Sequence, residues 1–185
     1  MKTLIYFVIL LCVSCNENKY VKIYTLPKIN SAIEKVPLEK VDNKTPFSWT
    51  VPANWLEIDK TSMRLASFNA PYGNGIADIS VTNFSGDGGG LKANVNRWRK
   101  QIGLESQSEQ IINKSIIVKK SKIGEYKFIK IINKSNEQSA FLCSIMKIKN
   151  STIFIKMKAS IDGVNELENE FLEFLSKFKK KEKKA

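Results

Sequence analysis

Five runs between residues 76 and 160 alternate apolar and polar side chains or are apolar throughout, and short polar turns separate most of them. In the run 76–84, three apolar residues alternate with three polar ones, in the order Ala77, Asp78, Ile79, Ser80, Val81 and Thr82. The other runs cover 110–119, 125–133, 139–149 and 151–160. A period of two is typical of half-buried strands, and connections this short join antiparallel neighbours. The sequence therefore predicts an antiparallel sheet that runs largely as a meander.

Two further strand regions precede these runs. Residues 47–58 read as a strand broken by Pro52, and 63–70 leads through a turn at 71–75 into the first alternating run. The stretch 15–44 mixes charges, prolines and scattered apolar residues with no sustained period, which predicts a tether. We therefore expect one domain over 45–179 and a lysine-rich tail over 180–185.

Two segments have the 3.6-residue period of an amphipathic helix. The first spans 91–101, and Gly103 follows it as a stop signal. Its narrow apolar seam consists of Leu91, Val95, Trp98 and Ile102. The second spans 163–180, with Asp162 expected as the N-cap. Its apolar stripe consists of Val164, Leu167, Phe171, Phe174, Leu175 and Phe178. These helices, placed beside an antiparallel sheet, predict an α+β fold.

Residues 1–14 have the pattern of a secretory signal peptide. Lys2 is a basic start, and 4–13 is an unbroken apolar run. That run is about half of the roughly 20 residues that a transmembrane helix needs. A small residue and then Cys15 follow it, which resembles a bacterial lipobox, although Cys12 stands where that motif usually has leucine. The resemblance implies cleavage before Cys15 and acylation of that cysteine.

Acylation of Cys15 would attach the mature protein to a membrane of the bacterial cell envelope, on the periplasmic side if the cell is Gram-negative. Several acyl chains hold a protein to a bilayer stably, whereas one chain does not. The alternative is ordinary secretion without a lipid. The sequence predicts an exported, membrane-anchored lipoprotein.

Few residues suit metal binding or nucleophilic catalysis. The chain has no histidine, which removes the commonest general base and the commonest metal ligand. Cys143 would be the single cysteine of the mature domain, apart from the acylated Cys15. It lies in the apolar run 140–146, which indicates a small buried side chain and not a nucleophile. We expect no cofactor and no metal.

The net charge of +12 at first suggests a nucleic-acid partner. Much of the excess belongs to the C-terminal run 177–184, however, and the chain has only three arginines, Arg64, Arg97 and Arg99, although arginine is favoured for base and phosphate recognition. We therefore predict no nucleic-acid partner. The run instead favours contact with anionic lipid headgroups. The residues that would make this contact are Lys179, Lys180, Lys181, Lys183 and Lys184.

In the stretch 85–104, SGDGGGLKANVNRWRKQIGL, a glycine-rich turn leads directly into the first helix. Glycines let backbone N–H groups converge at a helix N-terminus, which is the geometry of an anion site. The turn fits neither the dinucleotide fingerprint nor the phosphate-binding loop, and Asp87 would repel a phosphate. The alternatives are an anion site, a docking surface and a structural corner that needs positive φ. The residues of such a site would be Gly88, Gly89, Asn94, Arg97 and Trp98.

The order of three segments, WTVPANW, MRLASF and ISVTNFSGDGGGLKANVNRWRKQIGL, resembles a family of small exported bacterial lipoproteins of unassigned function with a PsbP-like plan. The resemblance covers about 45–179. It implies a central antiparallel sheet flanked by helices in an α/β/α sandwich. Relatives of this fold mostly bind other proteins or assist their assembly, so no catalytic residue is carried over.

The leading functional hypothesis is a non-catalytic binding or assembly module that docks another envelope protein. The docking face would carry Trp49, Trp55 and the helix around Arg97 and Trp98, because aromatic residues and arginine are enriched in binding hot spots. The same tryptophans would also suit a core.

Two alternatives belong to other classes. One is a small-molecule or anion-binding or hydrolytic domain, with Asp78 and Asp87 as carboxylates and Lys92 or Arg97 as electrophilic partners. The other is a polyanion or membrane-surface binder that uses the lysine run 177–184.

Overall fold

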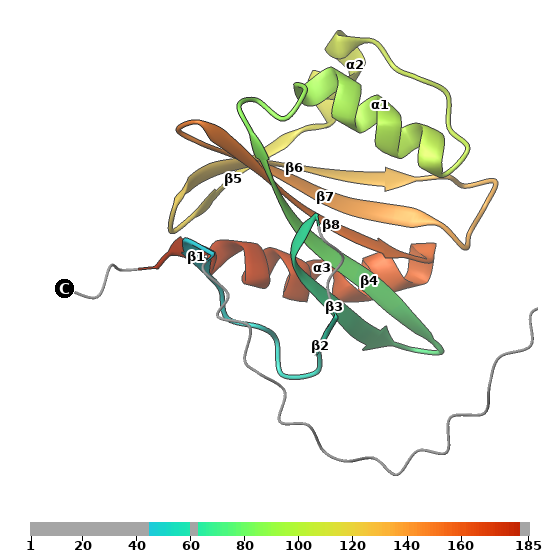
Figure 1. Ribbon diagram of the computed structural model, residues 1–185. Coiled ribbons are helices and arrows are strands. Elements are labelled where there is room, and N and C mark those ends of the chain that lie inside the picture. The colour runs from blue at the N-terminus through green and yellow to red at the C-terminus, as the bar shows by residue number, and fades with distance from the viewer. Residues whose placement is uncertain (1–44, 60–62, 182–185) are drawn as a thin grey trace, which may run out of the picture. The chain divides into compact units, whose positions relative to one another are not determined.

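The computed structural model describes residues 45–59 and 63–181. Within them, seven antiparallel strands form one sheet in the order β2-β3-β4-β8-β7-β6-β5 (Figure 1). These strands are β2 Leu56–Ile58, β3 Arg64–Tyr72, β4 Gly75–Ser85, β5 Ile117–Ser121, β6 Gly124–Ile132, β7 Ala140–Ile148 and β8 Ser151–Ala159. The strands from β5 to β8 form the predicted meander, and β4 pairs with β8 to join them to the β3–β4 hairpin.

One face of the sheet is covered by helix α3, Ile161–Ser176 (Figure 1). The predicted apolar stripe is confirmed, since all six of its residues are buried in the core between α3 and the sheet. The predicted N-cap, Asp162, lies two residues after the observed one. Ser160 is the N-cap, because its extended backbone lets its Oγ accept a hydrogen bond from Gly163 N at 3.0 Å.

The opposite face is partly covered by α1, Leu91–Gln101, and α2, Glu109–Ser115 (Figure 1). Val95, Trp98 and Ile112 from these helices pack against buried side chains of β6, β7 and β8. Those side chains are Ile129, Ile131, Phe141, Cys143, Ile145 and Phe154. The sheet thus lies between helices on both faces, and the predicted α+β class is confirmed.

The predicted strand at 110–119 is wrong over its first half. Residues 109–115 form α2, and β5 begins only at Ile117. The helix starts there because Ser108 accepts a hydrogen bond from Ile111 N, and Glu109 in the first turn suits the positive end of the helix dipole.

The C-terminal prediction also needs correction. The helix ends at Ser176 and not at 180, and Lys179–Lys180 forms strand β9, which pairs with β1, Phe47–Ser48. Lys181 N donates to Pro46 O at 2.9 Å, so the first part of the predicted tail is held against the start of the domain. Phe178 lies between helix and strand with its side chain fully buried, which fixes this arrangement.

Several predictions fall on residues outside the described ranges. They are the signal peptide 1–14, the lipid at Cys15, the tether up to residue 44, and the headgroup contacts of Lys183 and Lys184. They stay predictions.

Candidate functional site

The glycine-rich turn, residues 86–90, joins β4 to α1 and uses its N–H groups internally. Gly86 N donates to Asn150 O, Gly89 N donates to Asp87 Oδ1, and Gly90 N donates to Asp87 O. Gly86, Gly88, Gly89 and Gly90 all have positive φ. The turn therefore forms a strand-to-helix corner, and these three N–H groups are not presented to an anion.

Asn94 closes this corner from inside α1. Its buried amide donates from Nδ2 to Gly88 O at 2.8 Å and to Gly90 O at 2.6 Å. Its Oδ1 accepts a hydrogen bond from Arg97 Nη2 at 2.6 Å. Asn94 and Arg97, two of the five residues of the predicted site, thus hold the turn onto the helix.

The three tryptophans do not form one exposed surface. Trp98 is 3% exposed and packs edge-on against Phe154 at 5.9 Å, on the α1 face of the sheet. Trp55 is buried on the α3 face, where its Nε1 donates to Glu170 Oε2, and Trp49 stacks on an aromatic ring of the same core. The predicted docking residues therefore do not form one surface, because Trp49 and Trp55 lie on the α3 face of the sheet and Trp98 lies on the α1 face.

The residues of the enzyme alternative are not brought together. Asp78 lies within β4, about 23 Å along the extended strand from its end at Ser85, and Asp87 lies in the turn beyond that end. Asp78 binds Arg64, whereas Asp87 accepts a hydrogen bond within its own turn. Lys92 is exposed on α1. Among the described residues, no group of three His, Cys, Asp or Glu side chains could hold a metal ion.

Cys143 lies in β7 as predicted, fully buried under α1. Burial raises the pKa of its thiol well above the ordinary range, because the thiolate would be desolvated there. The thiol is a packing group, since the reactive form of cysteine is the thiolate.

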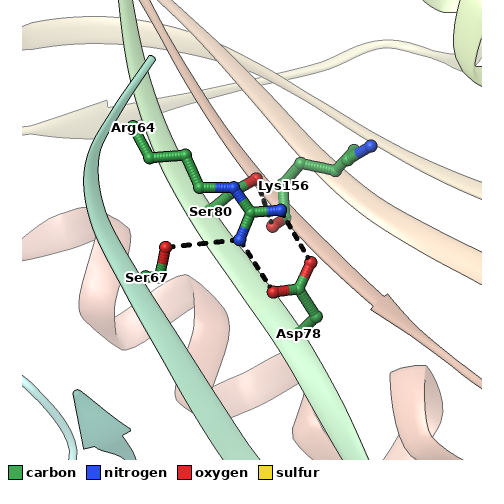
Figure 2. Close-up of polar contacts among 5 residues, drawn as sticks. All are labelled: Arg64, Ser67, Asp78, Ser80 and Lys156. Atoms are coloured by element: carbon green, nitrogen blue, oxygen red, sulfur yellow. Dashed lines mark hydrogen bonds and ion pairs between the residues drawn. The ribbon is translucent and has the colours of Figure 1, made fainter. Parts of the chain in front are cut away.

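A different set of polar side chains forms an organised cluster on the sheet (Figure 2). The guanidinium of Arg64 on β3 makes two parallel hydrogen bonds to the carboxylate of Asp78 on β4, Nη1–Oδ1 at 2.9 Å and Nη2–Oδ2 at 3.1 Å. Arg64 Nη1 also donates to Ser67 Oγ at 3.3 Å. A bidentate pair of this kind fixes both side chains in one orientation.

Lys156 on β8 borders the cluster. Its ammonium points away from the Arg64–Asp78 pair in Figure 2 and donates to Gln101 Oε1 on α1 at 3.1 Å, above the ring of Phe141 at 4.7 Å. Burial lowers the pKa of the Lys156 ammonium, and the nearby charges of Arg64 and Arg97 also lower it, while Asp78 opposes this shift. The cluster carries more positive than negative charge.

Large apolar side chains surround this cluster. The register pairs Leu56 with Asn69 and Ile58 with Ser67, and cross-strand partners project to the same face. Ile76 projects to that face too, because it alternates with the buried Ala77. Leu56 is 67% exposed and Ile76 is 65% exposed. A large exposed apolar side chain beside organised polar groups is characteristic of a binding surface.

We name this surface the open face, since Leu56, Ile58 and Ile76 on it are exposed, although Lys156 at its border contacts Gln101 of α1. It consists of Leu56, Ile58, Arg64, Ser67, Asn69, Ile76, Asp78, Ser80, Lys156 and Lys158. The alternating pattern of 77–82 predicted a polar side of the strand with Asp78 and Ser80, but it did not connect that side to Arg64, and Ser80 is buried. The signal in the sequence that could have indicated it is the pair of apolar residues in the short strand β2, Leu56 and Ile58, which are both exposed.

Comparisons with known proteins give similarity of fold only. No protein-family model and no curated protein matches the sequence. The PsbP protein of the cyanobacterium Synechocystis (CyanoP) superposes with a TM-score of 0.48 and 12% identity, over 74% of this chain and 87% of that one. LpqN of Mycobacterium tuberculosis, which is involved in cell envelope biogenesis, gives a TM-score of 0.44 and 10% identity, over 71% of this chain and 81% of that one.

A protein of Bacteroides thetaiotaomicron gives a TM-score of 0.47 and 14% identity over 75% of this chain. The chain spans 46% of the length of that protein. Similarity at these levels carries no conclusion about activity. Within the described residues, no helix is long and apolar enough to cross a membrane.

Proposed function

We propose that this chain is a lipid-anchored, non-catalytic module that binds another protein of the bacterial envelope through the open face. The observation that carries the proposal is the exposure of Leu56, Ile58 and Ile76 around a fixed arginine–carboxylate pair. A partner that covers these apolar side chains would remove them from water, and each such burial is worth about 1.5–3 kcal/mol at most.

The open face mixes apolar and charged side chains, which suits a surface that is in contact with water in the free protein and with a partner in the complex. Arg64 and Asp78 are hydrogen-bonded to each other before any partner arrives, so binding leaves neither of these two charges unpaired. Lys156 and Lys158 add positive charge beside it. The proposal therefore favours a partner with apolar residues at the centre of its contact and carboxylates at the border.

The test is site-specific photo-crosslinking in native envelopes, with the photoreactive phenylalanine analogue benzoylphenylalanine placed at Leu56 or Ile76. Both positions are expected to crosslink to the same protein. Asn169, which is exposed on α3, serves as the control position on the opposite face and is expected to give no such product.

A matched pair of substitutions sharpens this test. With the probe at Leu56, Ile76→Glu is expected to weaken the crosslink about tenfold, because a carboxylate would be desolvated in the contact. Ile111→Glu changes an isoleucine of α2 that is also exposed and is expected to have no effect. If both substitutions act equally, or if crosslinks at Asn169 match those at Leu56, the open face is not the docking surface.

The lipid anchor has a separate test. Cys15→Ala is expected to move the protein from the membrane fraction to the soluble exported fraction, because multiple acyl chains supply the stable attachment. Mass spectrometry of the N-terminal peptide measures the acyl groups directly. A wild-type protein that is found in the soluble exported fraction with an unmodified Cys15 would support ordinary secretion instead.

A further inference from the structure

Strand β5 forms the edge of the sheet opposite to β2, and its outer side pairs with none of the described strands. It pairs with β6 alone, in a register that sets Ile117 against Phe128 and Val118 against Lys127. An edge strand presents a row of unpaired N–H and C=O groups that can accept another extended segment. Proteins that do not use such an edge usually protect it with charges, prolines or a bulge.

The side chains of β5 fall into two adjacent pairs. Ile117 is 53% exposed and Val118 is 58% exposed, and they project to opposite faces of the sheet. Lys119 and Lys120 follow directly, again one on each face. The charges of Lys119 and Lys120 protect their half of the edge from unwanted strand pairing, whereas Ile117 and Val118 leave the other half unprotected.

A hollow of about 230 Å³ lies beside Val118 on the α1 face. Leu91, Val118 and Ile145 give it an apolar lining. Two lysines and two carboxylates, Lys127, Lys147, Asp87 and Glu125, also line it. A strand paired with β5 would project one side chain of each adjacent pair toward this face, because neighbouring residues alternate between faces. The hollow has room for an apolar side chain from such a strand.

We propose that β5 binds an extended segment of a partner protein by strand addition, and that the segment carries an acidic pair and an apolar pair. The partner segment runs antiparallel to β5. From the N-terminus of that segment, two acidic residues lie against Lys120 and Lys119, and the two apolar residues that follow lie against Val118 and Ile117. Opposite charges and apolar pairs across strands both stabilise the pairing, so the pattern of β5 determines the pattern of its partner.

A second copy of this chain does not fit the same edge. In the antiparallel register that pairs all five residues of β5 with β5, Lys119 lies against Lys119 and Val118 lies against Lys120. Like charges directly opposite one another destabilise a strand pair. The charge pattern therefore favours an acidic partner over self-association.

The experiment measures binding of the peptide Thr-Glu-Glu-Val-Ile-Thr to the full chain by fluorescence anisotropy, and measures amide hydrogen exchange at 117–121. The control peptide is Thr-Lys-Lys-Val-Ile-Thr. The acidic peptide is expected to bind about tenfold more tightly, since two attractive pairs replace two repulsive ones. It is also expected to slow exchange in β5.

The matched variant reverses the charges of the edge, with Lys119→Glu and Lys120→Glu together. It is expected to reverse the preference between the two peptides. Leu56→Glu changes the open face on the far edge of the sheet and is expected to leave peptide binding unchanged, so this proposal can fail independently of the open-face proposal.

Three outcomes would overturn the proposal. They are equal binding of the two peptides, no slowing of exchange in β5, or a preference that survives charge reversal. Vesicles that contain anionic phosphatidylglycerol form a further arm. If these vesicles slow exchange at 117–121 and the acidic peptide does not, the edge contacts a membrane and not a peptide strand.

Discussion

Replacing Phe174 by alanine is expected to lower the free energy of unfolding by about 3–5 kcal/mol, the range for removing a buried phenylalanine. The ring of Phe174 lies at the centre of the α3 core, with its centroid 5.2 Å from Trp55, 5.7 Å from Phe68 and 6.4 Å from Trp49. Such aromatic pairs add to the area that the ring buries. Because whole domains are stable by about 5–15 kcal/mol, this one change should remove a large share of the total.

Urea unfolding followed by far-ultraviolet circular dichroism measures this loss. Ile76→Ala is the control, since it removes an exposed apolar side chain and should change stability by no more than about 0.5 kcal/mol. A loss for Phe174→Ala as small as that of the control would contradict the packing of this aromatic core.

Gly88→Ala is expected to lower the free energy of unfolding by about 2–5 kcal/mol, as the sum of two effects. Gly88 has φ of 63°, a conformation that is strained for alanine. A Cβ at this position would also lie 2.7 Å from ring carbons of Phe154, which is buried against Trp98 and cannot move freely. The substitution therefore combines backbone strain with overpacking of the α1 core.

Gly86→Ala separates the two effects within the same turn. Gly86 has almost the same φ, 66°, but a Cβ there would meet no atom within 4 Å. Its expected loss is about 1–2 kcal/mol, from backbone strain alone. Equal losses for the two variants, measured by the same urea unfolding, would show that contact with Phe154 does not contribute.

The elements with strong local signals could be predicted from the sequence. The helix Leu91–Gln101 has the predicted bounds because glycines in positive φ, Gly90 and Gly103, bracket it. The stripe of α3 was equally clear, since its period continues over several turns. Alternation likewise predicted the β3–β4 hairpin and the meander.

Short elements that depend on one contact could not be predicted in this way. Helix α2 buries only Ile112, so no apolar period is long enough to distinguish it from a strand. Strand β9 exists because Phe178 is buried and Lys179–Lys180 meets Phe47–Ser48, a pairing between the two ends of the domain. Local sequence contains no signal for such a distant pair.

The candidate site was missed for a related reason. The pairing of Arg64 with Asp78 depends on the hairpin register and on the irregularity between Arg64 and Ala66. Charge and aromatic content drew attention to Trp98 instead, yet its place on the apolar seam of α1 already indicated burial. Exposure depends on which part of the sheet the helices cover, and this is a property of the whole fold.

The pairing of β1 with β9 brings the start and the end of the domain side by side. Pro46 and Lys181 are hydrogen-bonded neighbours, and the β3–β4 hairpin turns at Gly73 and Asn74 on the sheet itself. A permuted chain in which Lys181 was joined to Pro46 and which began at Asn74 would keep every strand pairing of the sheet. The order of strands along the gene is thus one of several orders that encode the same architecture.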